Sequence, residues 1–189
     1  MAVVKLLLDQ GAPVNSRTRS DSTSLQLAAS QGHVAVVRAL LIKHPDVNAT
    51  DSGGRAALWF ACSYNEKPEI IQLLLENHAH ANAKDTNGVT ALQSSAFHGR
   101  FEFVRLLLDH GANIDEHGYK GATALHWAVD GQQRNMVQFL LKRGAKTDVV
   151  DDENRTPLSW ARDAAAKRTR WNSRKLRKIE KLLQQQAAE

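Results

Sequence analysis

The sequence predicts an all-α fold in which similar helical units stack into a solenoid, and two observations lead to this prediction. The first is a repeat of about 33 residues: one leucine recurs at intervals of 33, 34, 33 and 33 residues, at Leu25, Leu58, Leu92, Leu125 and Leu158. The second is an apolar run late in each unit, spaced as on one helix face. Such units bury their apolar faces against their neighbours, so both observations favour a linear array.

Each unit should contain a turn, a first helix, a second helix and a return loop. Residues 85–117 show this order most clearly, with a turn at 85–88, Gly99 in mid-unit, then an apolar run and a Gly-Ala exit. Threonine two residues before the repeated leucine can cap the first helix with its hydroxyl group. The threonines at this position are Thr23, Thr90, Thr123 and Thr156. Glycine after a helix can adopt the left-handed conformation that ends it.

We treat residues 1–189 as a single domain. It comprises a half unit at 1–17, full units at 18–50, 51–84, 85–117 and 118–150, and an extended basic capping unit at 151–189. The second unit has Ala56 in place of the capping threonine and Asn65 in place of the mid-unit glycine, so we expect it to be the least regular. In the last unit the second apolar run comes nine residues late, which predicts two lengthened helices meeting near Trp171, with Asn172 or Ser173 capping the second.

A 33-residue period with a Thr-x-Leu start, a mid-unit glycine, an apolar run and a Gly-Ala exit resembles the ankyrin repeat, and the resemblance covers essentially the whole chain. It implies an ankyrin-repeat α-solenoid of stacked helix-turn-helix units with β-turn fingers, whose first helices and fingers line a concave groove. Ankyrin arrays usually bind proteins. The resemblance therefore implies a non-catalytic scaffold that binds a partner protein or peptide in this groove, as part of a larger multidomain protein.

The resemblance also places particular slots of each unit in the groove, two residues after the repeated leucine and one turn later. Aromatic residues make up only 6% of the chain, yet they gather in these slots. Tryptophan and tyrosine are typical interface anchors, and two aspartates near them favour a partner that carries lysine or arginine. The predicted groove contacts are Phe60, Tyr64, Phe97, His98, Trp127, Asp130, Trp160 and Asp163. The alternative is that some of these rings pack between adjacent units.

The finger tips differ from unit to unit, as a modular binding surface requires. The predicted contacts there are Arg55, Asn87, Tyr119, Lys120 and Asp152, with solvated loops as the alternative interpretation. A small-molecule-binding or catalytic groove, centred on Ser94 between Phe60 and Trp127, is an alternative function. The sequence contains neither a Gly-x-Ser-x-Gly nucleophile motif nor a Gly-x-x-x-x-Gly-Lys phosphate loop, so we expect no enzymatic activity.

Charge is unevenly distributed along the chain. Residues 1–161 contain 16 Lys or Arg and 17 Asp or Glu, a net charge of −1, whereas residues 162–189 contain 9 and 3, a net charge of +6. The basic patch comprises Lys167, Arg168, Arg170, Arg174, Lys175, Arg177 and Lys178. It has three interpretations: the solvated face of a cap, a nuclear-import-like or acidic-partner surface, and contact with nucleic acid or anionic lipid. Without a nucleic-acid module or an apolar span, we expect neither nucleic acid nor membrane as the partner.

Cysteine and histidine do not indicate a disulfide or a metal site. Cys62 is the single cysteine and falls in an alanine slot, which predicts a buried thiol and fits a reducing compartment. His78 and His80 lack a second pair at zinc-site spacing, and the resemblance assigns His126 to backbone hydrogen bonds between units. We expect no cofactor, no metal, and an intracellular protein of the cytoplasm or nucleus. We expect a monomer, with self-association through the open N-terminal helix as the alternative.

Overall fold

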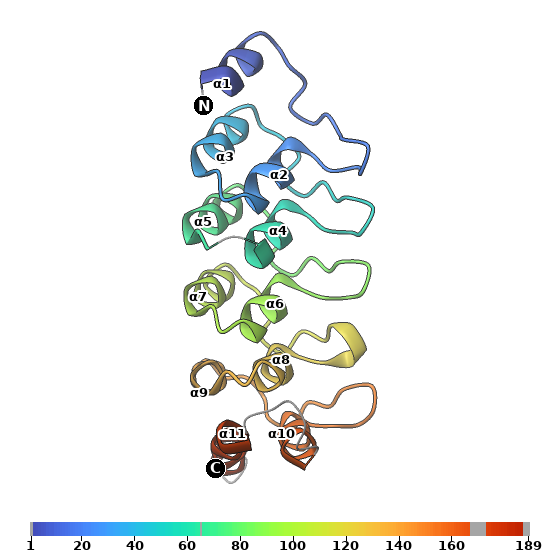
Figure 1. The fold of residues 1–189 in the computed structure, drawn as a ribbon, viewed down its shortest axis with the longest axis vertical. Helices are drawn as coiled ribbons and strands as arrows, with labels where there is room; N and C mark the ends of the chain where they lie inside the picture. The colour runs from blue at the N-terminus through green and yellow to red at the C-terminus, as the bar shows by residue number, and fades with distance from the viewer. Residues whose placement is uncertain (1, 65, 167–172, 187–189) are drawn as a thin grey trace.

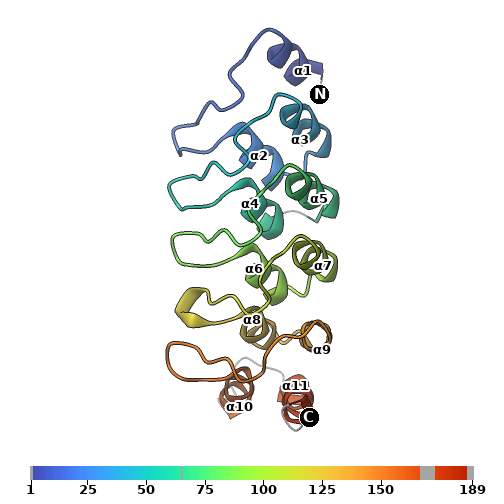
Figure 2. The ribbon, with the colours of Figure 1, turned by 180° about the vertical axis from the view of Figure 1, so that it is seen from behind.

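The computed structural model describes residues 2–64, 66–166 and 173–186, which form two layers of helices and a row of turn fingers. The inner layer contains α2 (Ser24–Ser30), α4 (Ala57–Tyr64), α6 (Ala91–Phe97), α8 (Ala124–Asp130) and α10 (Pro157–Ala166). The outer layer contains α1 (Ala2–Asp9), α3 (Val34–Leu41), α5 (Pro68–Glu76), α7 (Phe101–Asp109), α9 (Arg134–Lys142) and α11 (Ser173–Gln186). Figures 1 and 2 show the units stacked along one axis, with the fingers projecting from the inner layer. The predicted helical solenoid is confirmed.

The threonine caps lie where the repeat pattern places them. Thr23 and Thr90 accept hydrogen bonds from the third residue of their helices, Gln26 and Gln93, whose side chains bond back to the threonine backbone. This reciprocal capping box satisfies two N–H groups that the helix start leaves unpaired. Thr156 also accepts a hydrogen bond, at 3.3 Å, from the third helical residue. The first helices therefore begin at residues that the sequence predicts.

Left-handed residues end the first helices and shape the fingers, and most of them were predicted. Gly99 follows α6 with φ +69°, a conformation that favours glycine. In the fourth unit Gln132 occupies the equivalent position with φ 53°, so a non-glycine residue adopts it there. Asp21 and Asn154 stand where other fingers have glycine and have φ 62° and 57°, as expected for short polar side chains that tolerate this geometry.

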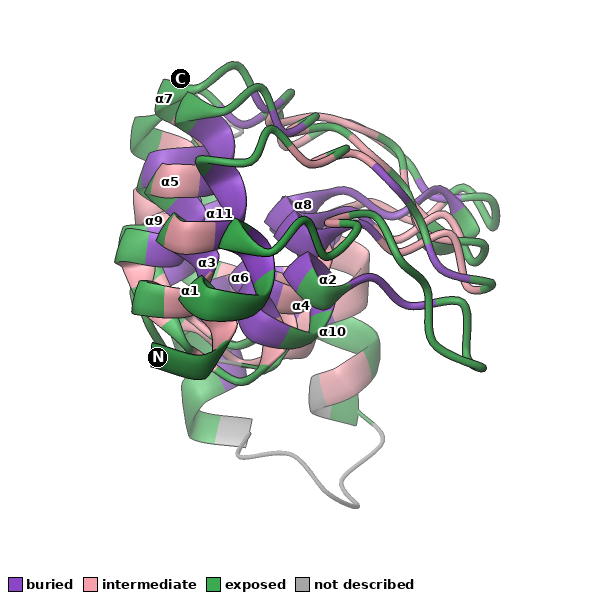
Figure 3. Ribbon diagram, turned by 90° about the horizontal axis from the view of Figure 1, so that it is seen from above, coloured by how far each residue is buried: buried purple, intermediate pink, exposed green. Residues whose placement is uncertain are grey.

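The core lies between the two helix layers and between neighbouring units. Val37, Ile71 and Val104 of successive outer helices have 0% exposure. In Figure 3 the buried residues follow the contact between the layers, while the fingers are mostly exposed or half-buried. Because each helix buries its apolar face against the next unit, the array is held together by nearest-neighbour packing.

Hydrogen bonds also join successive units at the fingers and the return loops. Gln26 Nε2 donates to the Ala49 carbonyl oxygen at the end of its own unit, at 2.8 Å, and to the Arg55 carbonyl oxygen in the next unit, at 2.9 Å. His126 Nε2 lies 3.0 Å from the Arg155 carbonyl oxygen, so the predicted backbone role of this histidine is confirmed. In the return loops, Asn48 Oδ1 accepts a hydrogen bond from the backbone N–H of His80 in the following unit, at 2.8 Å.

The second unit, which was expected to be the least regular, differs from the other units at its helix ends. α4 begins directly after Ala56, which has no hydroxyl to cap it, and α5 begins at Pro68. α4 has 8 residues and α5 has 9, close to the helix lengths of the neighbouring units, while Asn65 lies outside the described residues.

The last unit has a longer outer helix, α11. Leu176, Ile179 and Leu183 are buried, as predicted, and Leu182, also expected on the inner face, is only half-buried. Trp171 and Asn172 lie outside the described residues. The predicted junction between the two helices therefore stays a prediction.

Candidate functional site

Three side chains form a row that begins at the base of the second unit's finger and continues along α4 to the end of this helix. Arg55 stands at the base of the finger, and its guanidinium carbon lies 5.0 Å from the centre of the Phe60 ring. The Phe60 ring stacks on Tyr64, with ring centres 6.1 Å apart. Tyr64 is 61% exposed. We call Arg55, Phe60 and Tyr64 the α4 row.

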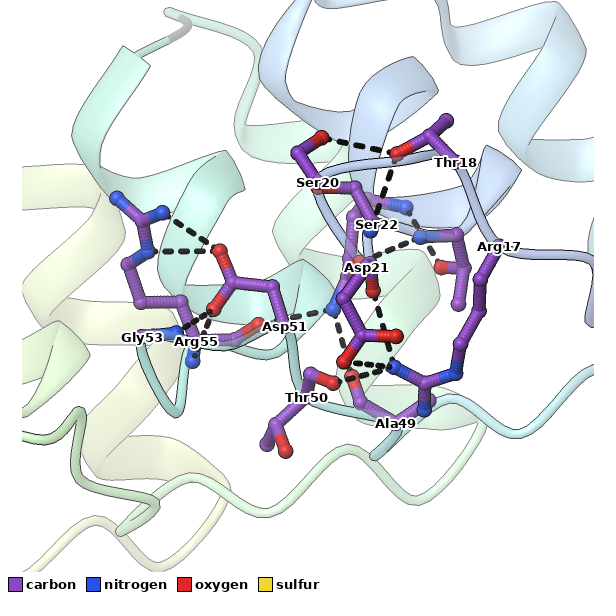
Figure 4. A network of polar contacts seen from close by, with 12 residues as sticks. Arg17, Thr18, Ser20, Asp21, Ser22, Ala49, Thr50, Asp51, Gly53 and Arg55 are labelled. Carbon is purple, nitrogen blue, oxygen red and sulfur yellow. Dashed lines mark hydrogen bonds and ion pairs between the residues drawn. The ribbon is translucent and has the colours of Figure 1, made fainter.

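A buried carboxylate holds the first member of the α4 row in place. Asp51 Oδ2 accepts hydrogen bonds from Arg55 Nε at 3.0 Å and Nη2 at 2.6 Å (Figure 4). Burial alone raises the pKa of Asp51, but hydrogen bonds from Arg55 and from the backbone N–H of Gly53 outweigh this effect and lower it. The carboxylate is therefore ionised at neutral pH and fixes the guanidinium over the ring, where a cation is attracted to the aromatic face.

A hollow of about 700 Å³ lies beside the α4 row, at the ends of the inner helices. It is lined by Ser30, Gln31, Gly32, Phe60, Tyr64, Glu66, Lys67 and Arg100. These residues come from three successive units, so the stacking of the units creates the hollow. An exposed ring beside a concavity of this size can anchor a partner side chain.

Ser94, around which a pocket was expected, does not line this hollow. Ser94 Oγ instead lies 3.3 Å from Ser63 Oγ of the previous unit. Trp127 does not line the hollow either, and its ring packs edge-on against Phe97 with centres 5.9 Å apart. The hollow is therefore lined by Phe60 but not by Ser94 or Trp127, and the pocket expected between Phe60 and Trp127 stays a prediction.

The predicted groove rings of Phe97, Trp127 and Trp160 are half-buried between adjacent units. Trp127 Nε1 is buried and has no hydrogen-bond partner among the described residues. The Trp160 ring packs against His126 of the previous unit, with centres 5.2 Å apart, and its Nε1 donates to Asp151 at 2.7 Å. His98 is exposed, with its ring against Phe97. Of the five predicted aromatic anchors, Tyr64 is therefore the exposed one.

The two predicted groove aspartates differ in their environment. Asp130 is half-buried, and burial raises the pKa of its carboxyl group. Asp163 is exposed on α10. Asp163 therefore presents the more accessible negative charge.

The predicted finger contacts divide into tips and a base. Asn87, Tyr119, Lys120 and Asp152 are exposed at the tips, whereas Arg55 belongs to the α4 row at the base. The Lys120 ammonium lies 5.4 Å from the centre of the Tyr119 ring. The backbone N–H of Asp152 donates to the Lys120 carbonyl at 3.1 Å, which joins two neighbouring tips.

The sequence interpretation missed two residues that contact predicted site residues, Trp59 in the second unit and Arg155 in the last unit. Trp59 lies beside Arg55, with the guanidinium 5.3 Å from its ring centre, and edge-on to both Phe60 and Tyr64. Arg155 repeats the role of Arg55 in the last unit, 5.3 Å from the Trp160 ring. For Arg155, the sequence signal that could have indicated this role is an Asp-x-x-x-Arg motif, which occurs at 51–55 and again at 151–155.

The basic patch is only partly described. Lys167, Arg168 and Arg170 lie outside the described residues. Arg174, Lys175, Arg177 and Lys178 are exposed on α11.

Chemically reactive groups are scarce in the described part of the chain. Cys62 has 0% exposure, and burial raises the pKa of its thiol to about 12, so it is a poor nucleophile at neutral pH. Residues 2–64, 66–166 and 173–186 contain no cluster of three or more side chains that could hold a metal ion. No helix in these segments has the length and apolar character needed to cross a bilayer.

Two helix layers with turn fingers define a helical repeat protein, and comparison with known sequences gives its family. The family model described as "Ankyrin repeats (3 copies)" matches residues 1–85 and 58–151. The chain therefore belongs to the ankyrin-repeat family, whose repeats are generally protein–protein interaction modules.

Curated relatives share single stretches of this chain. It is 35% identical over 100 residues to mouse ankyrin repeat domain-containing protein 63, covering 51% of this chain and 25% of the mouse protein. It is 37% identical over 92 residues to the ankyrin repeat and KH domain-containing protein mask of Drosophila melanogaster, covering 48% and 2%. It is 42% identical over 74 residues to the E3 ubiquitin-protein ligase XBAT33 of Arabidopsis thaliana, covering 39% and 14%. The chain thus spans a quarter or less of these relatives.

Proposed function

We propose that this chain is a non-catalytic binding module that takes a partner protein or peptide at the α4 row and the hollow beside it. The observation that carries the proposal is Tyr64, an exposed ring (61%) that is stacked on Phe60 and borders a hollow of about 700 Å³. A tyrosine has few rotatable side-chain bonds, so it loses little conformational entropy on binding, and it offers both an apolar face and a hydroxyl group. We also propose that the module works within a larger protein, as its relatives are longer.

The arrangement around Tyr64 supports binding rather than catalysis. Arg55 and Phe60 are already held in position by Asp51 and by ring stacking, so the surface is organised before a partner arrives. Preorganised anchors reduce the cost of ordering side chains on association. The single thiol in the unit, Cys62, is buried and protonated, and it cannot serve the hollow as a nucleophile.

The test compares two exposed tyrosines of the same chain. Tyr64→Ala removes the proposed anchor, and Tyr119→Ala removes a tyrosine that is 42% exposed at a finger tip. Both variants should keep the helical circular dichroism of the parent. Proteins captured from a cell lysate should be retained by the parent and by Tyr119→Ala and lost by Tyr64→Ala, since removal of an interface hot spot costs about 2 kcal/mol or more.

A photo-crosslinking residue at position 64 identifies the contact directly. It should form covalent adducts with the captured partner, whereas the same residue at position 119 should not. Equal capture by all three proteins, or crosslinks from position 119 alone, would contradict the proposal and move the binding surface to the fingers.

A further inference from the structure

The outer surface of α11 carries a stripe of four cations. Arg174, Arg177, Lys178 and Lys181 line a hollow of about 420 Å³, and all four are exposed. Positions i, i+3, i+4 and i+7 share one face of an α-helix. The four charges therefore lie together on one side of α11, and we call them the α11 stripe.

The opposite side of α11 fixes the stripe to the array. Leu176 and Ile179 have 0% exposure and Leu183 has 1%, and α11 packs against both α9 and α10. Successive helical residues are rotated by about 100°, which puts these three residues directly opposite the stripe. The cations are thus presented outward from a helix that is docked along its length.

Three of the four stripe cations are not neutralised by nearby carboxylates of the described residues. Glu180 is the one acidic residue of α11, and its Oε1 accepts from Arg162 Nε of α10 at 3.1 Å. The neighbouring helix α9 contains no acidic residue. Among the described residues, Arg177, Lys178 and Lys181 form no ion pair. Like charges at these spacings repel one another, so an anionic partner would be stabilising.

We propose that the α11 stripe is a second docking surface and that its partner is an acidic peptide segment, rich in Asp or Glu, of another protein. The stripe spans eight residues, or about 10 Å between its end positions at a rise of about 1.5 Å per residue. This length matches three to four residues of extended peptide at about 3.3 Å per residue. A short acidic segment can therefore cover the stripe from end to end, with alternate side chains facing the cations.

A long polyanion fits this surface less well. Duplex nucleic acid would continue beyond α11 along an array whose first 161 residues have a net charge of −1, which gives no net attraction for phosphates. The four residues of the stripe also include no ring on which a base could stack. The observations therefore favour a short acidic peptide over nucleic acid.

The experiment uses the full chain and a fluorescein-labelled peptide of eight glutamates, with eight glutamines as the uncharged control. Fluorescence anisotropy should show binding of the glutamate peptide at about 0.05 M salt and its loss at about 0.5 M salt, since screening shortens the range of charge interactions. Lys178→Gln/Lys181→Gln should weaken binding by about tenfold, which corresponds to about 1.4 kcal/mol. The matched control is Lys5→Gln/Lys175→Gln, which changes the net charge equally but lies off the stripe and should change affinity less than about twofold.

Three outcomes would overturn the proposal. Equal weakening by both double variants would show a general charge effect instead of a site. Tighter, stripe-dependent binding of a duplex DNA fragment, or of vesicles containing phosphatidylserine, would assign the stripe to nucleic acid or to membrane. Tyr64→Ala should bind the glutamate peptide as the parent does, so failure of the stripe and failure of the proposed function are distinguishable.

Discussion

Asp51 and Arg55 form a buried-to-surface ion pair at the base of one finger, in which a carboxylate with 1% side-chain exposure holds a guanidinium with 33% exposure at 2.6 Å. The same pair recurs in the last unit, where Asp151 and Arg155 have 1% and 31% exposure and lie 2.9 Å apart. In both units the arginine lies over an aromatic ring of the following helix. The motif therefore couples the finger to the inner helix.

This relationship predicts a loss of stability in acid. Burial alone would raise the pKa of Asp151, but hydrogen bonds from the Arg155 backbone, Trp160 and the Arg155 side chain lower it to about 2, against 3.8 unperturbed. A group with a lowered pKa stabilises the fold above its unfolded pKa, and that contribution is lost as pH falls from about 4 to about 2. Asp151→Asn should lower the free energy of unfolding by about 2 kcal/mol at pH 7.

Urea unfolding at pH 7 and pH 2.5 measures this effect. The difference between the parent and Asp151→Asn should shrink at the lower pH, where the parent has lost most of the same contribution. Asp152→Asn, a change at the exposed neighbouring residue, should leave stability unchanged at both values. A pH-independent difference for Asp151→Asn would show that the carboxylate charge is not what stabilises the finger.

His126 predicts a second pH effect, nearer neutrality. Burial lowers the pKa of this histidine below its usual 6.5, so the folded chain keeps the ring neutral, with Nδ1 accepting from the Thr123 N–H at 3.1 Å. The unfolded chain binds a proton more readily, and stability should therefore fall as pH decreases below about 6.5. Gln26 and Gln93 occupy the same slot and make equivalent bonds without titrating.

His126→Gln should therefore keep the stability of the parent at pH 7.5 within about 1 kcal/mol and remove the decline between pH 6.5 and pH 5. Thermal unfolding across this range measures both quantities. His126→Ala is the control that loses the bonds to Thr123 and Arg155, and it should be less stable at every pH. An unchanged pH profile in the glutamine variant would mean that another group causes the decline.

Ala56 predicts a gain of stability. It is 5% exposed, and the equivalent threonines Thr23, Thr90 and Thr123 are buried to the same degree, so a threonine side chain fits this slot. Ala56→Thr should add a hydroxyl cap to α4 and raise the free energy of unfolding by about 1 kcal/mol. The control Ala56→Val has the same shape without the hydroxyl group. Urea unfolding that ranks Val equal to Thr would show that capping is not the cause.

Several parts of the fold could be predicted because they depend on local spacing. The capping threonines, the left-handed Asp21 and Asn154, and the buried face of α11 all follow from positions within one unit. A helix face or a cap is defined by residues three or four apart, and the repeat shows that spacing several times. The predicted hydrogen bond of His126 to the backbone of the next unit was also confirmed, because the prediction followed from the family pattern.

By itself, the sequence determined the family, the order of the units and which faces are buried, because these depend on contacts repeated at a constant interval. Only the tertiary structure decided which rings of the inner layer are exposed. Tyr64 is 61% exposed, whereas Trp127 and Trp160 occupy predicted groove slots and are half-buried. The physical reason is that exposure depends on the side chains of the neighbouring unit. Phe97 packs against Trp127 and His126 against Trp160, in each case from the previous unit, and these pairings vary along the array.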